Sequence, residues 1–173
     1  MGGLDARYML ARLDMARHVA ALVTVSTPHR GSSYADWCVR NLGRRLGLLK
    51  LMGFLGLDVQ GILDLTTDRC ARFNEQIPDV PGVAYYSVSA ASAWQQVPPF
   101  ALHAHHVVYE AEGPNDSLVS VRSARWGEHL CTWAANHWHA VNRRFIPQLH
   151  HGDDIVPQYL SVIDTLMARG LAA

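Results

Sequence analysis

The residues best suited to chemistry in this chain are an aspartate and a histidine in two polar loops. Asp116 lies in segment 113–127, and His137 lies in segment 135–145. A carboxylate can accept the Nδ1–H of a histidine and fix its tautomer, which leaves Nε2 to take a proton from a nucleophile. Two structural interpretations stay open, because Asp116 also suits a plain turn and His137 a hydrogen-bonded core position. The pair indicates general-base chemistry if the fold brings the loops together.

The elements that would position these loops are typical of an α/β domain. Residues 4–17 carry apolar positions at helical spacing, and the apolar run 18–27 is typical of a strand buried on both faces of a parallel sheet. Residues 83–90 and 106–112 also predict strands. Functional groups in such a sheet gather after the carboxyl ends of the strands. We expect strands 18–26 and 83–90 to lie along an open edge.

Three further segments have helical features. Residues 66–75 begin with threonine cap candidates, and a helix is expected from about Asp154 to a stop at Gly170. The leucine-rich, partly basic segment 41–63 has two interpretations: a helical pair that covers the core, or a segment that lies on a membrane surface. It has no run of about 20 uncharged apolar residues, so it predicts no membrane span.

Composition limits the classes of function. The chain has 173 residues, enough for one domain, and its 15 basic and 15 acidic residues cancel, which gives no support for nucleic-acid binding. The cysteines Cys38, Cys70 and Cys131 form neither a disulfide framework nor a zinc motif, and we expect them to be small buried side chains. Histidines gather at 103–106 and 150–151, but nothing in their spacing indicates a metal site, and no cofactor is expected.

The first residues of the chain suggest where a nucleophile would lie. A nucleophile elbow, G-x-S-x-G, joins a strand to a helix. Met1 and Gly2 fit its last two positions, and the helical pattern begins directly behind them. The expected nucleophile is therefore a serine immediately before Met1, in the chain order Ser, Asp, His. Ser26, Ser32 and Ser33 have no G-x-S-x-G context and are not candidates.

Four segments in order resemble the α/β-hydrolase triacylglycerol lipases of bacteria and fungi: MGGLDARYM, VSTPHRGSSYAD, NDSLVSVRSARWG and NHWHAVNRRF. The resemblance implies an α/β fold, an incomplete α/β-hydrolase domain over residues 1–173. This would be the C-terminal half of the sheet with its helices, and a lid-like helical insertion at about 33–75. It implies that Asp116 and His137 are the acid and base of a triad that hydrolyses carboxylic esters of lipids.

The sequence also departs from that family. The backbone N–H of Met1 matches an oxyanion-hole donor, but only if the chain extends upstream, because a terminal ammonium is no amide. The chain as given is therefore expected to be inactive. Bacterial relatives hold calcium with an aspartate two residues after the histidine, where this chain has His139. Arg143 replaces a nearby glutamine of that site, so no calcium site is expected.

The expected partner is a lipid ester, and the lid-like segment is expected to make peripheral contact with a lipid surface. One alternative is a lipase-derived binding or interaction module without catalysis. The other is a phospholipid or lipid-anchor deacylase of the same fold, because one triad serves any acyl ester.

Overall fold

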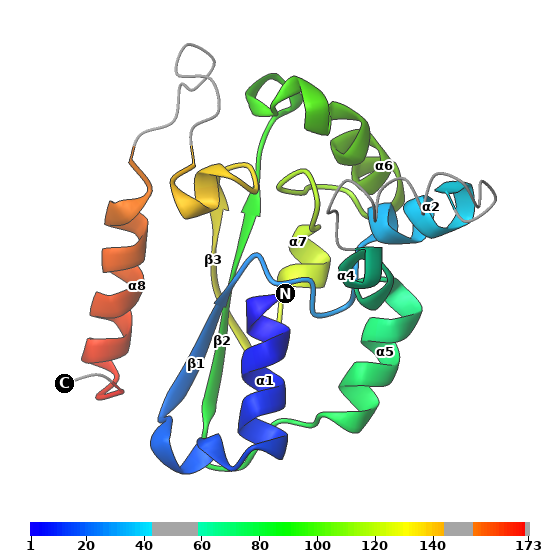
Figure 1. Ribbon diagram of the computed structural model, residues 1–173. Helices are drawn as coiled ribbons and strands as arrows, with labels where there is room; N and C mark the ends of the chain where they lie inside the picture. Colours follow the sequence, from blue (N-terminus) through cyan, green and yellow to red (C-terminus); the bar gives the residue numbers. More distant parts are fainter. Residues whose placement is uncertain (43–58, 144–153, 172–173) are drawn as a thin grey trace.

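The protein is built on a parallel three-stranded sheet, seen edge-on in Figure 1. The computed structural model describes residues 1–42, 59–143 and 154–171. The strands β1 (Ala21–Val25), β2 (Ala84–Ala91) and β3 (Glu128–Ala134) lie in the order β1-β2-β3. The register between β2 and β3 shifts between Ser87 and Val88. All three carboxyl ends therefore meet at one edge, where the loops of the site begin.

Helices cover both faces of this sheet. On one face lies α8 (Val156–Ala168), and on the other lies α1 (Gly2–Arg12), with the remaining helices beyond it (Figure 1). The remaining α-helices are α2 (Ser33–Leu42), α4 (Val59–Asp64), α5 (Thr67–Gln76), α6 (Leu102–Glu112) and α7 (Val121–Ala124). Four short 3-10 helices complete the described part: η1 (Met15–His18), η2 (Trp94–Gln96), η3 (Pro99–Ala101) and η4 (His139–Val141). No helix among the described residues has the length and apolar character needed to cross a membrane.

The structure confirms most of the predicted elements. The first helix and strand are α1 with η1, and β1; the helix at 66–75 is α5; the strand at 83–90 is β2; the C-terminal helix is α8. Gly170 follows α8 with a φ of 69°, a left-handed conformation that glycine adopts without steric cost. The segment 41–63 lies largely outside the described residues, so neither of its interpretations is tested.

The prediction of a strand at 106–112 was wrong, because this segment belongs to α6. Its buried residues Ala104, His105 and Val108 lie on one helical face, and the helix packs against α2. The β-branched pair Val107 and Val108 favoured a strand by local propensity, but burial of this face decides for the helix.

The predicted open edge is half wrong. β2 lies between β1 and β3 and is central, whereas β1 has no strand on its outer side among the described residues. β1 is also less buried than expected, since only Thr24 of its residues is fully buried. β3 was not predicted at all. Trp133 is its one buried residue, so it shows no apolar alternation that a sequence search would detect.

The core lies between the sheet and α8. Val88 and Ala90 of β2 and Trp133 of β3 form a buried cluster with Ile155 and Val162. The partly buried hydrophobic residues packed against this cluster are Val23, Val25, Leu130, Tyr159 and Leu166. Burial of this kind contributes roughly 25 cal/mol per Å² of apolar surface, which fixes α8 against the strands.

A glycine allows α1 to pack closely on the other face. A Cβ on Gly3 would lie 2.3 Å from Thr27 Oγ1 and 2.9 Å from Thr24 Cγ2, whereas a Cβ on Gly2 would meet nothing within 4 Å. Only the second of the two glycines is therefore required for packing. Its close approach fixes Met1 at the carboxyl end of β1.

Two of the three cysteines are buried, and the lid-like segment is helical where it is described. Cys38 and Cys70 are buried, as expected, but the expectation was wrong for Cys131, which is exposed on β3. The segment 33–75 contains α2, α4 and α5, and its residues 43–58 lie outside the described part of the chain.

Candidate active site

A tight turn after α6 holds Asp116. The Asn115 side chain accepts a hydrogen bond from Ser117 N, an arrangement that asparagine favours in turns. Ser117 has a φ of 101°, and the turn closes where Asp116 N donates to Val119 O. Asp116 is fully buried, and its Oδ1 accepts hydrogen bonds from Leu118 N at 3.0 Å and Val119 N at 2.8 Å. The turn therefore holds the Asp116 carboxylate in place by its own hydrogen bonds, independently of any contact with His137.

A second asparagine-led turn holds His137 directly after β3. Asn136 Oδ1 accepts hydrogen bonds from Trp138 N and His139 N, which places the backbone for η4. Asn136 Nδ2 donates to Gln96 O and so ties the turn to η2. His137 N donates to Asp116 O at 2.6 Å, which joins the two turns through the backbone.

The structure brings the two predicted site residues together. His137 Nδ1 lies 2.8 Å from Asp116 Oδ2, and the His137 side chain is 36% exposed. Burial lowers the pKa of His137, but the hydrogen bond and negative charge of Asp116 raise it by more, so the net pKa lies above its ordinary value. Because the carboxylate accepts the proton of Nδ1, the neutral ring carries its lone pair on Nε2, the arrangement that a general base requires.

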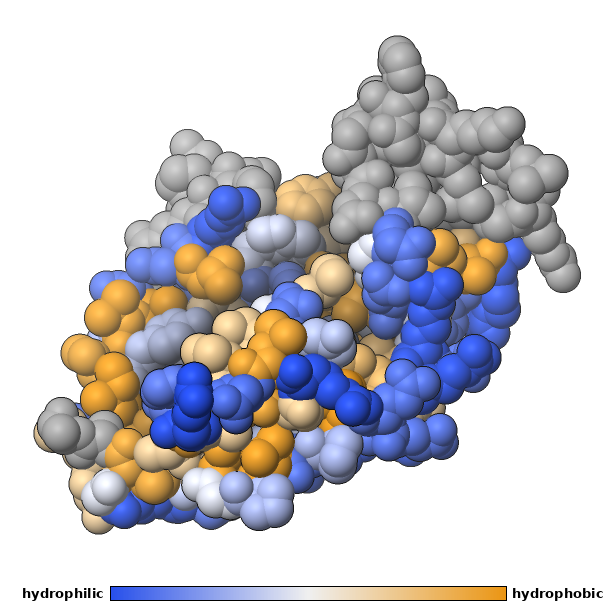
Figure 2. All heavy atoms as spheres, turned by 60° about the horizontal axis from the view of Figure 1, so that its bottom comes forward, coloured by the Kyte–Doolittle hydropathy of each residue, from blue (hydrophilic) through white to orange (hydrophobic). Residues whose placement is uncertain are grey.

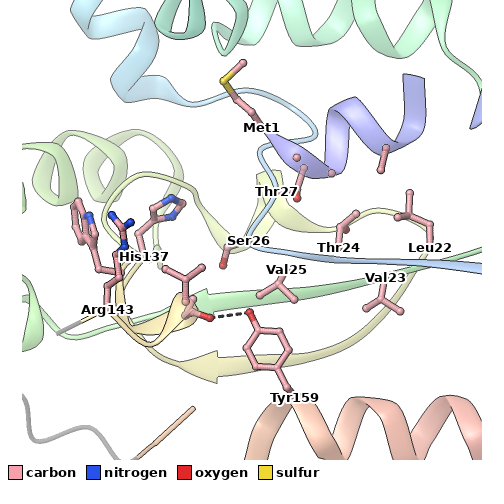
Figure 3. Close-up of a pocket in the computed structure, with 16 residues that line it drawn as sticks. Met1, Leu22, Val23, Thr24, Val25, Ser26, Thr27, His137, Arg143 and Tyr159 are labelled. Carbon is pink, nitrogen blue, oxygen red and sulfur yellow. Dashed lines mark hydrogen bonds between the residues drawn. The ribbon is translucent and has the colours of Figure 1, made fainter. Parts of the chain in front are cut away.

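A hollow of about 550 Å³ lies beside His137, between α1 and α8 (Figure 3). Its floor is β1, and its rim carries Met1 on one side and His137 with Arg143 on another. Tyr159 closes the lower side, where its hydroxyl donates to Ala140 O at 2.8 Å. The hollow runs from the site along the outer edge of β1.

Met1 lies at the end of the hollow nearest the site. Its carbonyl accepts the hydrogen bond from Leu4 N that begins α1, and its amino group is near enough to His137 to lower the pKa of the imidazole. The predicted oxyanion position and the predicted base therefore border one cavity. Of the three serines set aside as nucleophiles, Ser26 also borders it, with a buried hydroxyl that has no partner among the described residues.

The metal-ligand types do not converge in the described part of the chain, where no group of three His, Cys, Asp or Glu side chains could hold an ion. His103 instead packs edge-on against the Trp37 ring, with ring centroids 4.5 Å apart. His150 and His151 lie outside the described residues. His139 is buried and Arg143 lines the hollow. The expected absence of calcium stays a prediction.

Sequence reasoning missed the two asparagines that build the turns. Asn115 and Asn136 are buried, and each immediately precedes a site residue. The repeated dipeptides Asn-Asp and Asn-His were a usable signal, because an asparagine side chain can replace a backbone acceptor in a tight turn.

No family model matches the chain. Among curated proteins, triacylglycerol lipase 2 of Saccharomyces cerevisiae is 33% identical over an alignment 194 residues long, gaps included. The match covers 98% of this chain and 56% of the yeast protein, so the chain spans about half the length of its curated relative.

Solved structures give the same fold. Lipase BlEst2 of Bacillus licheniformis in its mature form has a TM-score of 0.66 at 22% identity, over 93% of this chain and 61% of that one. The lipase of Staphylococcus hyicus has a TM-score of 0.70 at 16% identity, over 97% and 68%. A metagenomic carboxyl esterase has a TM-score of 0.70 at 22% identity, over 86% and 47%. The chain is therefore similar in sequence to a triacylglycerol lipase and shares part of the α/β-hydrolase fold of these lipases and esterases.

Proposed function

We propose that this chain supplies the acid and the base of a serine esterase that hydrolyses carboxylic esters of lipids. The observation that carries the proposal is the 2.8 Å contact between Asp116 Oδ2 and His137 Nδ1 at the rim of a hollow. Asp116 orients the imidazole and stabilises its protonated form, and His137 transfers protons. The likeness to lipases supports the lipid ester as substrate class.

The proposed reaction is acyl transfer to a serine and then to water. His137 Nε2 takes the proton of the serine hydroxyl as Oγ bonds to the ester carbonyl carbon. The same proton passes to the leaving alcohol when the carbon–oxygen bond breaks. In the second half, His137 takes a proton from water as the water oxygen bonds to the acyl carbon. It then gives this proton to the serine Oγ when the bond between Oγ and the acyl carbon breaks, which releases the acid and restores the serine. Asp116 stabilises the imidazolium that forms in each half.

The nucleophile in this proposal is a serine directly before Met1. Met1 borders the same hollow as His137, and α1 begins directly after Met1, as an elbow requires. With a peptide bond in place, the Met1 N–H would be a backbone amide that can donate to the oxyanion. The donor would contribute roughly 3 kcal/mol to the transition state.

The segment at about 33–75 is proposed as the lid over the acyl pocket, in contact with lipid through its leucine-rich part. Its described ends are joined: Ser32 N donates to Leu65 O, and Thr67 donates through N and Oγ1 to the Asp36 carboxylate. These bonds hold the two ends of the insertion together, as expected of a segment that covers a pocket as one unit.

The test is to read the transcript upstream of Met1 and to express the chain with its in-frame extension. We expect a strand that ends in Gly-x-Ser, and hydrolysis of p-nitrophenyl butyrate and emulsified triacylglycerol by the extended protein. Asp116→Asn and His137→Gln should each lower kcat/KM roughly a thousandfold or more. His18→Gln, at the opposite end of β1, is the control.

A stop codon directly upstream, or an extended protein without esterase activity, would overturn the proposal and favour a binding module. Activity confined to phospholipids or acylated peptides would keep the triad and replace the triacylglycerol substrate. The unextended chain should hydrolyse no ester above the rate of its His137→Gln variant.

A further inference from the structure

We propose that Ser32 is a positioning residue that holds Asp116 in the orientation required by His137. The inference rests on the proposed function, because it assigns a role to a residue behind the acid of that site. Ser32 lies where the chain leaves the sheet domain and enters the lid-like segment. It was set aside above as a nucleophile and has no role in the mechanism.

Ser32 and Asp116 both bind the peptide group between Leu118 and Val119. Its N–H donates to Asp116 Oδ1 at 2.8 Å, and its carbonyl accepts from Ser32 Oγ at 2.6 Å. The serine hydroxyl and the carboxylate are therefore bound to opposite ends of the same planar unit. Because a peptide plane is rigid, fixing its oxygen also fixes the direction of its N–H.

The other oxygen of the Asp116 carboxylate extends this series of hydrogen bonds to His137. Asp116 Oδ2 accepts from His137 Nδ1 at 2.8 Å. One line of hydrogen bonds thus runs from the Ser32 hydroxyl through the peptide and the carboxylate to the imidazole. Hydrogen bonds in series polarise one another, so the first donor strengthens the hold of the peptide on Asp116.

Ser32 is itself held in place from several sides. It is 7% exposed, its N–H donates to Leu65 O at 2.9 Å, and its hydroxyl accepts from Tyr34 N at 3.2 Å. The Tyr34 and Leu65 contacts belong to the two ends of the lid-like segment. The Ser32 hydroxyl group therefore connects the ends of the lid-like segment to the turn that holds Asp116.

Ser123 in α7 provides a matched control. Ser123 is 1% exposed, and its hydroxyl donates to Gly31 O, one residue before Ser32. It also accepts from Arg30 N at 3.2 Å. Ser123, in α7, joins the loop after β1 to the segment that follows Asp116, as Ser32 does, but it does not bind the peptide group that holds Asp116.

The test is the pKa of His137, measured by NMR titration of the 173-residue chain and its variants. The charged groups that act on the imidazole are Asp116 and the amino terminus. Arg143 lines the same hollow. We expect Ser32→Ala to lower the pKa of His137 by about 0.5 or more, because a loosened carboxylate raises it less. Ser32→Thr, which keeps a hydroxyl, should restore it.

Ser123→Ala should leave the pKa of His137 within about 0.1 of the wild-type value while lowering thermal stability as Ser32→Ala does. An unchanged pKa in Ser32→Ala, or an equal fall in Ser123→Ala, would overturn the inference. This readout needs no nucleophile, so it can fail while the extended protein is active, and it can succeed while the extended protein is inactive. In an active extended protein, Ser32→Ala should lower kcat about tenfold with little change in KM.

Discussion

At the residue scale, the loop after β1 contains a buried histidine, His29, that stays neutral in the folded protein until the pH falls to about 3. Arg7 only donates hydrogen bonds, and its Nη1 lies 3.4 Å from His29 Nδ1, so Nδ1 is the acceptor nitrogen. The proton is therefore on Nε2, 2.9 Å from Thr24 Oγ1. Burial, followed by the charges of Arg7 and Arg30, lowers the pKa of His29 to about 3.

Because of His29, we expect the protein to lose stability as the pH is lowered. The folded pKa lies below the ordinary 6.5, so the unfolded chain binds the extra proton between pH 6.5 and about 3. The contribution of His29 to stability is complete above pH 6.5 and is lost as the pH falls through this window. The slope from this group is at most about 1.4 kcal/mol per pH unit.

Urea unfolding of wild type and His29→Gln between pH 4 and 7.5 measures this effect. We expect the wild type to lose stability more steeply than the variant below pH 6.5. Thr24→Val is the control, because it removes the partner of Nε2 and lowers stability at every pH but leaves the histidine to titrate. Parallel curves for wild type and His29→Gln would contradict the prediction.

At the element scale, the position of α1 relative to β1 determines where Met1 lies. Gly3→Ala forces a Cβ into the space that Thr24 and Thr27 fill. We expect it to destabilise the protein by about 1–3 kcal/mol, the usual cost of overpacking. Gly2→Ala adds the same methyl group to open space in the same helix and should be neutral, or stabilising by up to about 1 kcal/mol.

Thermal melting of both variants decides between these outcomes. A similar melting temperature for Gly2→Ala and Gly3→Ala would mean that α1 does not approach β1 as closely as described. The comparison is sharp because the two variants have the same composition and differ only in the face of α1 that carries the methyl group.

At the scale of the whole molecule, the three strands differ in how well they are protected. β2 has a hydrogen-bonded neighbour on each side and contains residues with no exposed surface, including Ser87, Val88 and Ser89. β1 has β2 on one side and borders the hollow on the other. Figure 2 shows hydrophobic residues on the left of the molecule, the side on which α8 lies in Figure 1. The exposed large hydrophobic residues of α8 include Leu160 and Ile163.

Hydrogen exchange should follow this order. The amides of β2 are expected to exchange most slowly in the chain, and those of β1 at least tenfold faster, because local opening of an edge strand breaks fewer contacts. Mass spectrometry of peptic fragments, or NMR, resolves the two strands. Equal protection of β1 and β2 would show that the outer edge of β1 is covered in solution, for example by a second copy of the chain.

The sequence alone determined the elements whose signal is local. The apolar run of β1, the strand β2, the helix α5 and the stop of α8 at Gly170 were all readable, because periodicity and turn residues act over a few positions. The Thr66 side chain does not cap α5 as the sequence suggested. The four motifs in order also predicted the likeness to lipases that the yeast relative supports, and they pointed to the two loops whose Asp116 and His137 lie in contact.

Only the tertiary structure decided the rest. Residues 106–112 became part of a helix because Ala104 and Val108 bury one face, and β3 formed although its side chains are mostly exposed. The contact between Asp116 and His137 joins residues 21 positions apart, and the link from Ser32 to Leu118 spans 86. Such contacts depend on where separate elements pack, and no local pattern records the free energy of that packing.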